Sequence, residues 1–346
     1  MHEHALRAIL LIQAVEESDT KGELLPLEER EAATQIVLRD AATNIQDAFT
    51  GETLSRAGER LLVRRALHLH ERLRLRAPIT DHLLAVAAGS GARDALLVAA
   101  VLAGVLLAAL DGHGYIEILS LPLTLLLAWN FLVYMLRIAN VLRGRPPSAL
   151  GLPSWYSRWM GNRAGSVLRR SRSFNAPLAA ALPRFSSDWA ALARPVVMQR
   201  ATRLFHTCAA LVALGLIVGL FVRGYVLRDT AGWASGFLAP YVVRVILWLL
   251  YGPASIFGGI ALPASAQEVA ALHVTAGVGG AEPVAWIDLI ALTATLYIIV
   301  PRMLAAAAAS LQLWRVARRM EVPASVVPYA RRTLLATAAV PKGNEL

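Results

Sequence analysis

Long runs of apolar residues constrain this chain more than any other feature of its sequence. They lie at 95–110, 118–136, 204–222 and from about 283 past 300. A helix needs roughly 20 such residues to span a bilayer. Of the 346 residues, 56% are hydrophobic and only 17% are charged, whereas about a quarter are charged in a typical soluble domain. The sequence therefore predicts an all-α, polytopic membrane protein with about four transmembrane helices.

The distribution of arginine predicts the orientation of these helices. The segment 143–203 is rich in arginine and has Asp188 as its one acid, and the segment after 315 is basic as well. The connection 111–117 contains neither lysine nor arginine. Since positive residues stay on the cytoplasmic side, we expect both termini and 143–203 to be cytoplasmic, in a bacterial inner membrane.

These features divide the chain into seven predicted regions. Residues 154–174 of the basic loop combine Trp155 and Trp159 with arginines, which favours a helix in the headgroup plane that contacts anionic lipids. The regions are a helical cytoplasmic N-terminal region (1–92), a transmembrane hairpin (93–142), the basic cytoplasmic loop with amphipathic helices (143–203), a transmembrane helix (204–222), an outer loop (223–282), a transmembrane helix that extends into the cytoplasm (283–320) and a cytoplasmic C-terminal segment (321–346).

A further apolar stretch, 245–267, tests this topology. It has no charge and is long enough to span, but it contains Pro253, Gly258, Gly259 and Pro263. A complete crossing would place the arginine-rich C-terminal segment outside, against the positive-inside rule. We therefore expect a re-entrant or interfacial pair of short helices on the outer side, covered by other spans or subunits.

Within the spans, glycines and charged residues are the candidates for function. Gly215 and Gly219 have the spacing that lets two helix backbones approach closely, within one chain or in a homo-oligomer. If the last span is 283–301, Arg302 lies at the inner face and Asp288 near the outer one. If the span is shifted toward Trp314, Arg302 is intramembrane and needs a partner.

Nothing in the sequence predicts catalysis or a cofactor. There is no phosphate-binding glycine motif, and Cys208 is the only cysteine. Cys208 and His206 have no evident third ligand, so no metal site is expected. Asn130 is expected to form hydrogen bonds between helices. The net charge of +10 is explained by topology and lipid contact, and no nucleic-acid-binding module accompanies it. We expect a non-enzymatic protein.

The sequence GYVLRDTAGWASGFLAP, residues 224–240, is expected to form a corner outside the third span. Arg228 either pairs with Asp229 or holds a lipid phosphate, and Trp233 suits the membrane interface. The alternative is a pore mouth or ligand-binding corner. The residues of this outer corner or possible pore mouth are Tyr225, Arg228, Asp229, Trp233 and Arg244.

The same corner carries a resemblance. The string 224–238, the Pro-Ala-Ser at 253–255, the Leu-Pro at 262–263 and the N-terminal ALRAILLIQAVEESD resemble a bacterial membrane family that is catalogued as a domain of unknown function. Members of that family are typically encoded beside a predicted GTPase. The family pattern has a glutamate after the tryptophan, whereas this chain has Ala234, so a role that needs a carboxylate there does not carry over.

Two functions are compatible with these observations. The first is a membrane protein that anchors or couples to a soluble cytoplasmic partner, which the resemblance implies is a GTPase. The second is an oligomeric channel or transporter that uses the broken outer stretch 238–267, because broken helices often mark transport sites.

Overall fold

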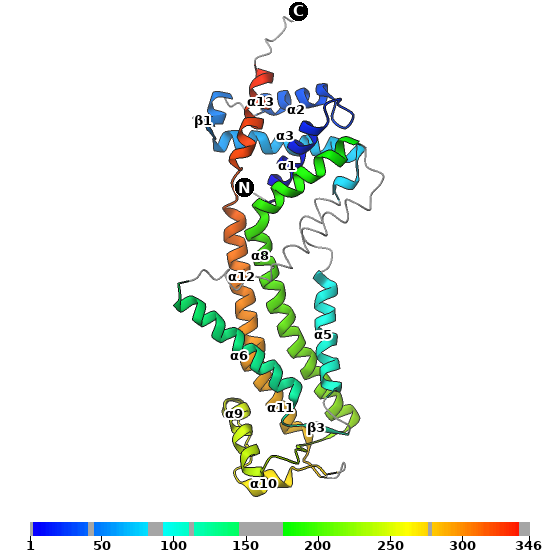
Figure 1. Ribbon diagram of the computed structural model, residues 1–346. Coiled ribbons are helices and arrows are strands. Elements are labelled where there is room, and N and C mark those ends of the chain that lie inside the picture. Colours follow the sequence, from blue (N-terminus) through cyan, green and yellow to red (C-terminus); the bar gives the residue numbers. More distant parts are fainter. Residues whose placement is uncertain are drawn as a thin grey trace, which may run out of the picture. The chain divides into compact units, whose positions relative to one another are not determined.

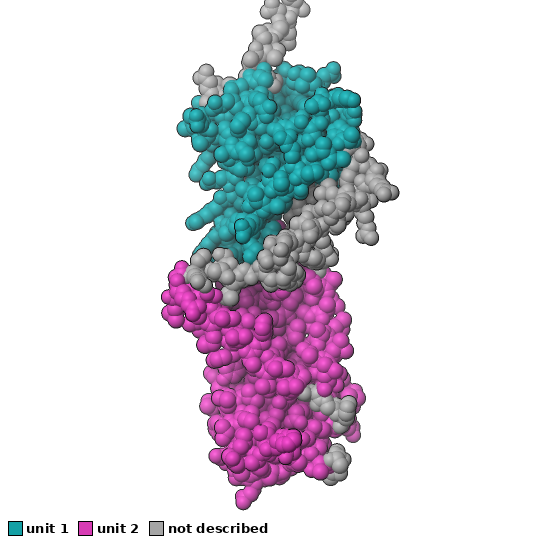
Figure 2. Space-filling model, viewed as in Figure 1, with its two compact units in different colours: residues 1–91, 152–199, 311–346 teal, residues 92–151, 200–310 magenta. Residues whose placement is uncertain are grey.

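The computed structural model describes residues 3–40, 45–81, 93–110, 114–144, 176–275 and 279–338. Within these ranges the protein is all-α, with only short strands besides its helices (Figure 1). The chain divides into two compact units, which Figure 2 colours separately. Unit 1 comprises residues 1–91, 152–199 and 311–346, and unit 2 comprises residues 92–151 and 200–310. The predicted amphipathic helix around Trp155 lies outside the described residues.

Unit 1 is built around α1 (Glu3–Ser18), a helix that is buried on almost every face. Leu6, Ile9, Leu11 and Ile12 are fully buried, as expected for a helix with neighbours all round. The other elements of unit 1 are α2 (Leu27–Asp40), η1 (Ile45–Ala48), the hairpin of β1 (Phe49–Thr50) and β2 (Thr53–Leu54), α3 (Arg56–Arg76), the first part of α8 (Ala176–Phe221), the end of α12 (Val300–Arg318), η5 (Ala324–Val326) and α13 (Val327–Ala338).

Three segments that are distant in sequence share the core of unit 1. Leu69 of α3, Leu182 of α8 and Tyr329 of α13 belong to one buried cluster with α1. The predicted N-terminal region, basic loop and C-terminal segment are therefore joined, in their described parts, in one folded unit.

Unit 2 contains the helices that are suited to a membrane. Four helical segments of the described chain are long and apolar enough to cross one. In order they are 121–140 in α6 (Leu121–Leu142), 176–227 in α8 and the π-helical turn η3 (Val222–Leu227), 240–258 in α9 (Pro240–Gly258), and 283–318 in α11 (Pro283–Ala294), the π-helical turn η4 (Thr295–Ile299) and α12.

This set differs from the four expected spans at one place. α5 (Arg93–Ala109) covers the first apolar run with 17 residues, or about 26 Å at about 1.5 Å per residue, slightly less than a bilayer core. α9 takes its place among the four. The outward side chains of α5 are nevertheless apolar, since Val98, Leu102 and Leu106 are all exposed. This is the composition of a helix that faces lipid.

A small sheet lies at one end of unit 2, where three connections between its helices meet. β3 (Tyr115–Glu117) pairs in parallel with β4 (Thr230–Gly232), and Ala231 of β4 also bridges to Ala281. The connections from α5 to α6, from α8 to α9 and from α10 (Ala266–Ala271) to α11 thus meet there.

The stretch around α9 leaves this sheet and returns to it. Trp233 at its start bridges to His273 at its end, and Arg244 donates from Nη1 to the carbonyl of Ala264 at 2.5 Å. The excursion starts and ends at the same place. The expected short helices are wrong, because α9 continues through Pro253 to Gly258, is followed by Gly259 with a left-handed φ of 64°, and is long and apolar enough to cross a membrane. A re-entrant or interfacial position of this stretch stays a prediction.

Candidate functional site

The outer corner is organised by a largely buried ion pair that the sequence analysis did not include. Asp229 pairs with Arg223, not with Arg228, at 2.8 Å between Oδ2 and Nε. Arg223 also donates to the carbonyl oxygens of Ala108, at 2.9 Å, and of Tyr115. One guanidinium therefore joins η3, the end of α5 and β3. Of the two alternatives for Arg228, a pair with Asp229 is wrong, because η3 turns Asp229 back onto its own helix end, and contact with a lipid phosphate stays a prediction.

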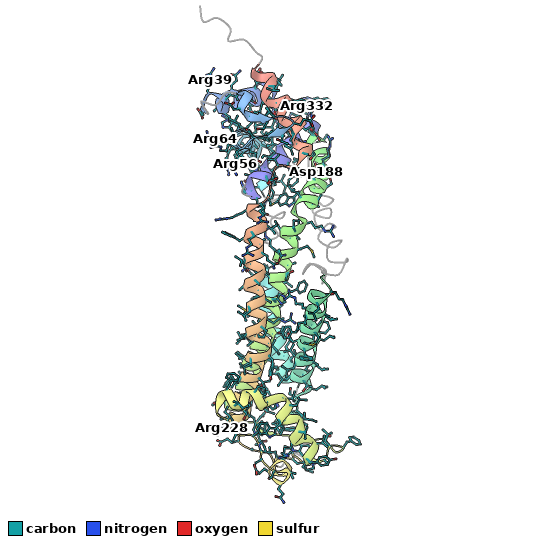
Figure 3. All side chains as sticks on the ribbon, turned by 90° about the vertical axis from the view of Figure 1, so that its left-hand side faces the viewer. Arg39, Arg56, Arg64, Asp188, Arg228 and Arg332 are labelled. Carbon is teal, nitrogen blue, oxygen red and sulfur yellow. The ribbon has the colours of Figure 1, made fainter. Side chains whose placement is uncertain are left out.

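The other residues of the predicted corner do not converge on one site. Arg228 adopts a left-handed φ of 57° at the end of η3, and Tyr225 is exposed and stacks on Phe221. Trp233 is 2% exposed, and its indole N–H donates to the carbonyl of Val269 at 2.8 Å. Trp233 is thus a core residue of the corner, not an anchor that faces headgroups. Figure 3 labels Arg228 in this corner.

The predicted packing glycines lie where α5 and α8 touch. A Cβ atom on Gly215 would stand 2.1 Å from the carbonyl oxygen of Val101, and one on Gly219 would stand 2.5 Å from the Cβ of Ala108. On α5, Gly104 is equally close to the backbone of α8. The two backbones therefore approach within one chain through small residues on both helices.

A polar cluster in unit 2 joins α6, α8 and α12 around Arg302. Arg302 is 6% exposed. Its Nε donates to Oδ1 of Asn130 at 2.6 Å, and its Nη1 lies 3.2 Å from Nδ1 of His206. The guanidinium carbon stands 5.6 Å from the ring centre of Tyr134. Arg302 is therefore buried and held by two other helices, and it does not simply extend to the membrane surface. Asp288, in contrast, is exposed on α11.

The protonation state of His206 follows from the guanidinium donor that it faces. A guanidinium has only donors, so Nδ1 of His206 must accept and the imidazole is neutral with its proton on Nε2. Asn130 donates an amide N–H to the carbonyl of Leu126 at 2.7 Å, and its amide oxygen accepts from Arg302. Tyr134 donates to the carbonyl of Tyr297 at 3.1 Å, within the π-helical turn η4. Every described partner of Arg302 is neutral.

Unit 1 contains a second buried arginine, and this one has a carboxylate partner. Arg65 pairs with Glu16 at 2.7 Å, and the hydroxyl of Tyr329 donates to the other oxygen of Glu16 at 2.6 Å. Burial, together with the charge of Glu16, raises the pKa of Tyr329 well above its usual value, so the phenol remains a donor. The network lines an open cleft of about 290 Å³ and connects α1, α3 and α13.

The surface of α3 carries three exposed arginines in a row. Arg56, Arg60 and Arg64 are spaced by four residues and lie within about 80° of one another around the helix. No salt bridge to a described residue neutralises them. Figure 3 labels Arg56 and Arg64. Like charges at this spacing destabilise a helix by about 0.2–0.5 kcal/mol per pair. These three residues, here called the α3 arginine face, therefore lower the stability of the fold.

Neither unit shows a metal centre in its described part. The described residues contain no group of three or more His, Cys, Asp or Glu side chains that could hold a metal ion. Comparison of the chain with protein-family models, curated proteins and solved structures finds no match. The family resemblance of residues 224–238 therefore stays a prediction.

The Arg65 site was missed in the sequence, and the Arg302 site was anticipated only as separate residues. The partners of Arg65 lie 49 and 264 residues away, so no local pattern signals them. For Arg302 the signals were present separately: Asn130, His206 and Arg302 are polar interruptions of three apolar runs. Their convergence depends on how the helices pack.

Proposed function

We propose that this chain is a non-enzymatic protein of the bacterial inner membrane whose unit 1 docks a soluble cytoplasmic partner. The observation that carries the proposal is the α3 arginine face, Arg56, Arg60 and Arg64, on a folded helical unit. Three exposed like charges without ion-pair partners reduce helix stability and form a surface complementary to an acidic partner. The resemblance of residues 224–238 implies that this partner is a GTPase.

The arrangement of the chain supports this role. Unit 1 combines both termini with part of the basic loop around one core, and α8 and α12 continue from it into unit 2. A partner bound to unit 1 would thus be attached to the membrane by two continuous helices. The positive-inside rule supports a cytoplasmic position for unit 1 and its termini, and the basic loop would add contacts with anionic lipids.

The alternative, an oligomeric channel or transporter that uses 238–267, has less support. Most of the exposed side chains of α9 are apolar, with Leu249, Ile256 and Phe257 each more than three-quarters exposed, and Arg244 is the exposed charge of this helix. A water-filled path for ions needs carbonyl or charged groups along it, whereas this face suits lipid or a second copy of the chain. Flux through liposomes that contain the purified protein would favour the channel over docking.

The docking proposal is tested in two steps. The full-length protein is crosslinked in its native membranes, purified in detergent and analysed by mass spectrometry, and we expect one soluble GTP-binding protein in stoichiometric amount. That protein is then titrated against the wild type and the triple variant Arg56→Gln, Arg60→Gln, Arg64→Gln. Loss of rim charges slows association and weakens binding, so we expect at least a tenfold loss of affinity.

A matched triple variant supplies the control. Arg315→Gln, Arg318→Gln and Arg319→Gln removes the same charge from exposed positions at and just after the end of α12 and should reduce affinity less than threefold. If no stoichiometric partner is recovered, or if both triple variants weaken binding equally, the α3 arginine face is not the docking surface.

A further inference from the structure

The charge of Arg302 is not balanced by the part of the chain that the structure describes. No salt bridge joins it to a described residue, and its contacts are Asn130, His206 and the ring of Tyr134. Burying a charge without a counter-charge costs several kcal/mol. Asn130, His206 and Tyr134 engage three of the five N–H donors that a guanidinium carries. Arg302 therefore has both unbalanced charge and donors for a further acceptor.

The apolar runs around Arg302, Asn130 and His206 indicate how deep this cluster lies in the membrane. His206 lies three residues after Arg203, at the start of the run 204–222, and Arg137 ends the run of α6. From Pro283, beside the small sheet, to Arg302 the helix covers about 28 Å at about 1.5 Å per residue, close to the roughly 30 Å of a bilayer core. The cluster thus lies at the edge of the apolar layer, on the side where 143–203 begins and ends.

A second cation lies on the same face of α6. Asn130, Tyr134 and Arg137 follow one another at spacings of four and three residues, so all three face the same way. Arg137 is half-buried. An anion that reaches Arg302 past the half-buried Tyr134 would therefore also come within reach of Arg137. Planar guanidinium groups match the oxygens of a phosphate in charge and in geometry.

From these observations we infer that Arg302, supported by Arg137, binds a phosphate group in a site formed by α6, α8 and α12. The chemistry is that of a phosphate oxyanion, and the edge of the apolar layer is where the headgroup phosphates of anionic phospholipids lie. Asn130 and His206 act as positioning residues, because they orient the guanidinium without adding charge. This inference is independent of the docking proposal.

The test is thermal unfolding of the delipidated full-length protein in a neutral detergent. Phosphatidylglycerol, phosphatidylcholine and inorganic phosphate are added in separate arms. We expect phosphatidylglycerol to raise the midpoint of unfolding by several degrees more than phosphatidylcholine, because a ligand of the native state stabilises it. Arg302→Gln should remove most of this difference, and Arg302→Lys, which keeps the charge, should retain part of it.

The matched control is Arg143→Gln, which removes an exposed charge near the end of α6 and should keep the full response. If Arg302→Gln does not fold, Arg137→Gln takes its place, with bound lipid counted by native mass spectrometry. A response to millimolar phosphate that Arg302→Gln abolishes would assign the same site to free phosphate. An equal response to both lipids, or a response that survives the loss of Arg302 or Arg137, would overturn the inference.

Discussion

The two ends of unit 2 each bury an arginine, and they do so in opposite ways. At the sheet end, Arg223 pairs with Asp229 and donates to two carbonyl oxygens. At the other end, Arg302 contacts an amide oxygen, an imidazole nitrogen and a phenol ring. The first arginine has its charge balanced by the chain itself, whereas the second does not among the described residues. The comparison separates a structural arginine from one that is available to a ligand.

Unit 1 shows that the chain can balance a buried arginine when the fold requires it. Arg65 has Glu16 as its partner, and Arg30 pairs with the fully buried Asp19. Three backbone N–H groups also bind Asp19, and these bonds and the charge of Arg30 lower its pKa although burial opposes them. Against these examples, the neutral surroundings of Arg302 are the exception.

The largest expected effect comes from breaking the balanced pair at the sheet end. Asp229→Ala leaves Arg223 buried without a counter-charge, which costs about 3–5 kcal/mol. We expect a large drop in the unfolding midpoint of the protein in detergent. Asp288→Ala, at an exposed position of α11, is the control and should leave the midpoint unchanged. A small effect of Asp229→Ala would remove the basis of the comparison.

A substitution between the two ends tests whether they are independent. In Gly215→Ala the new Cβ lies 2.1 Å from the carbonyl oxygen of Val101, so α5 must move and Arg223 loses its contact with Ala108. Overpacking of this kind costs about 1–3 kcal/mol. The response to phosphatidylglycerol should persist, because α5 contributes nothing to the Arg302 cluster. Gly236→Ala, where a Cβ meets no atom within 4 Å, controls for the substitution itself.

Replacing each arginine by methionine sharpens the comparison most directly. Arg302→Met exchanges an unbalanced charge for an apolar chain of similar length, and such exchanges are often neutral or stabilising. Without anionic lipid we therefore expect a change below about 1 kcal/mol, whereas Arg223→Met should destabilise clearly because it leaves Asp229 unpaired. The measurement is the midpoint of thermal unfolding of both variants in the same detergent. Equal losses would show that Arg302 is as structural as Arg223.

The smallest effect concerns the pH dependence of unit 1. Burial lowers the pKa of His70 below its usual 6.5, although the charge of Asp81 partly opposes this. The unfolded chain then binds a proton at higher pH than the folded one, so stability is present above about pH 6.5 and falls as the pH is lowered below it. Thermal unfolding measured at pH 7.5 and 5.5 should show this fall in stability, and His70→Asn should make the fall smaller.

His68→Asn is the control for this prediction. His68 lies two residues away on the same helix and is half-buried. Its loss should leave the pH dependence unchanged. If His70→Asn keeps the full fall between the two pH values, other groups of unit 1 are responsible for it.

Some features of the site could be predicted because they are local. The Gly215 and Gly219 spacing indicated a close helix contact, but the partner, Gly104, became visible only in the packed structure. Asn130 was expected to bond between helices, without its acceptor or donor being identifiable. A pair between Asp229 and the adjacent Arg228 was one of two alternatives, since sequence alone does not show that η3 points Asp229 back toward Arg223.

By itself, the sequence determined that the chain is helical, that it belongs in a membrane and which of its connections are basic. These properties depend on the local concentration of apolar and charged residues, which acts without regard to distant partners. Only the tertiary structure decided which residues meet. Arg302 and Asn130 are 172 residues apart, and Tyr329 and Glu16 are 313 apart. Such contacts depend on the register and rotation of packed helices, which the spacing of residues along the chain does not specify.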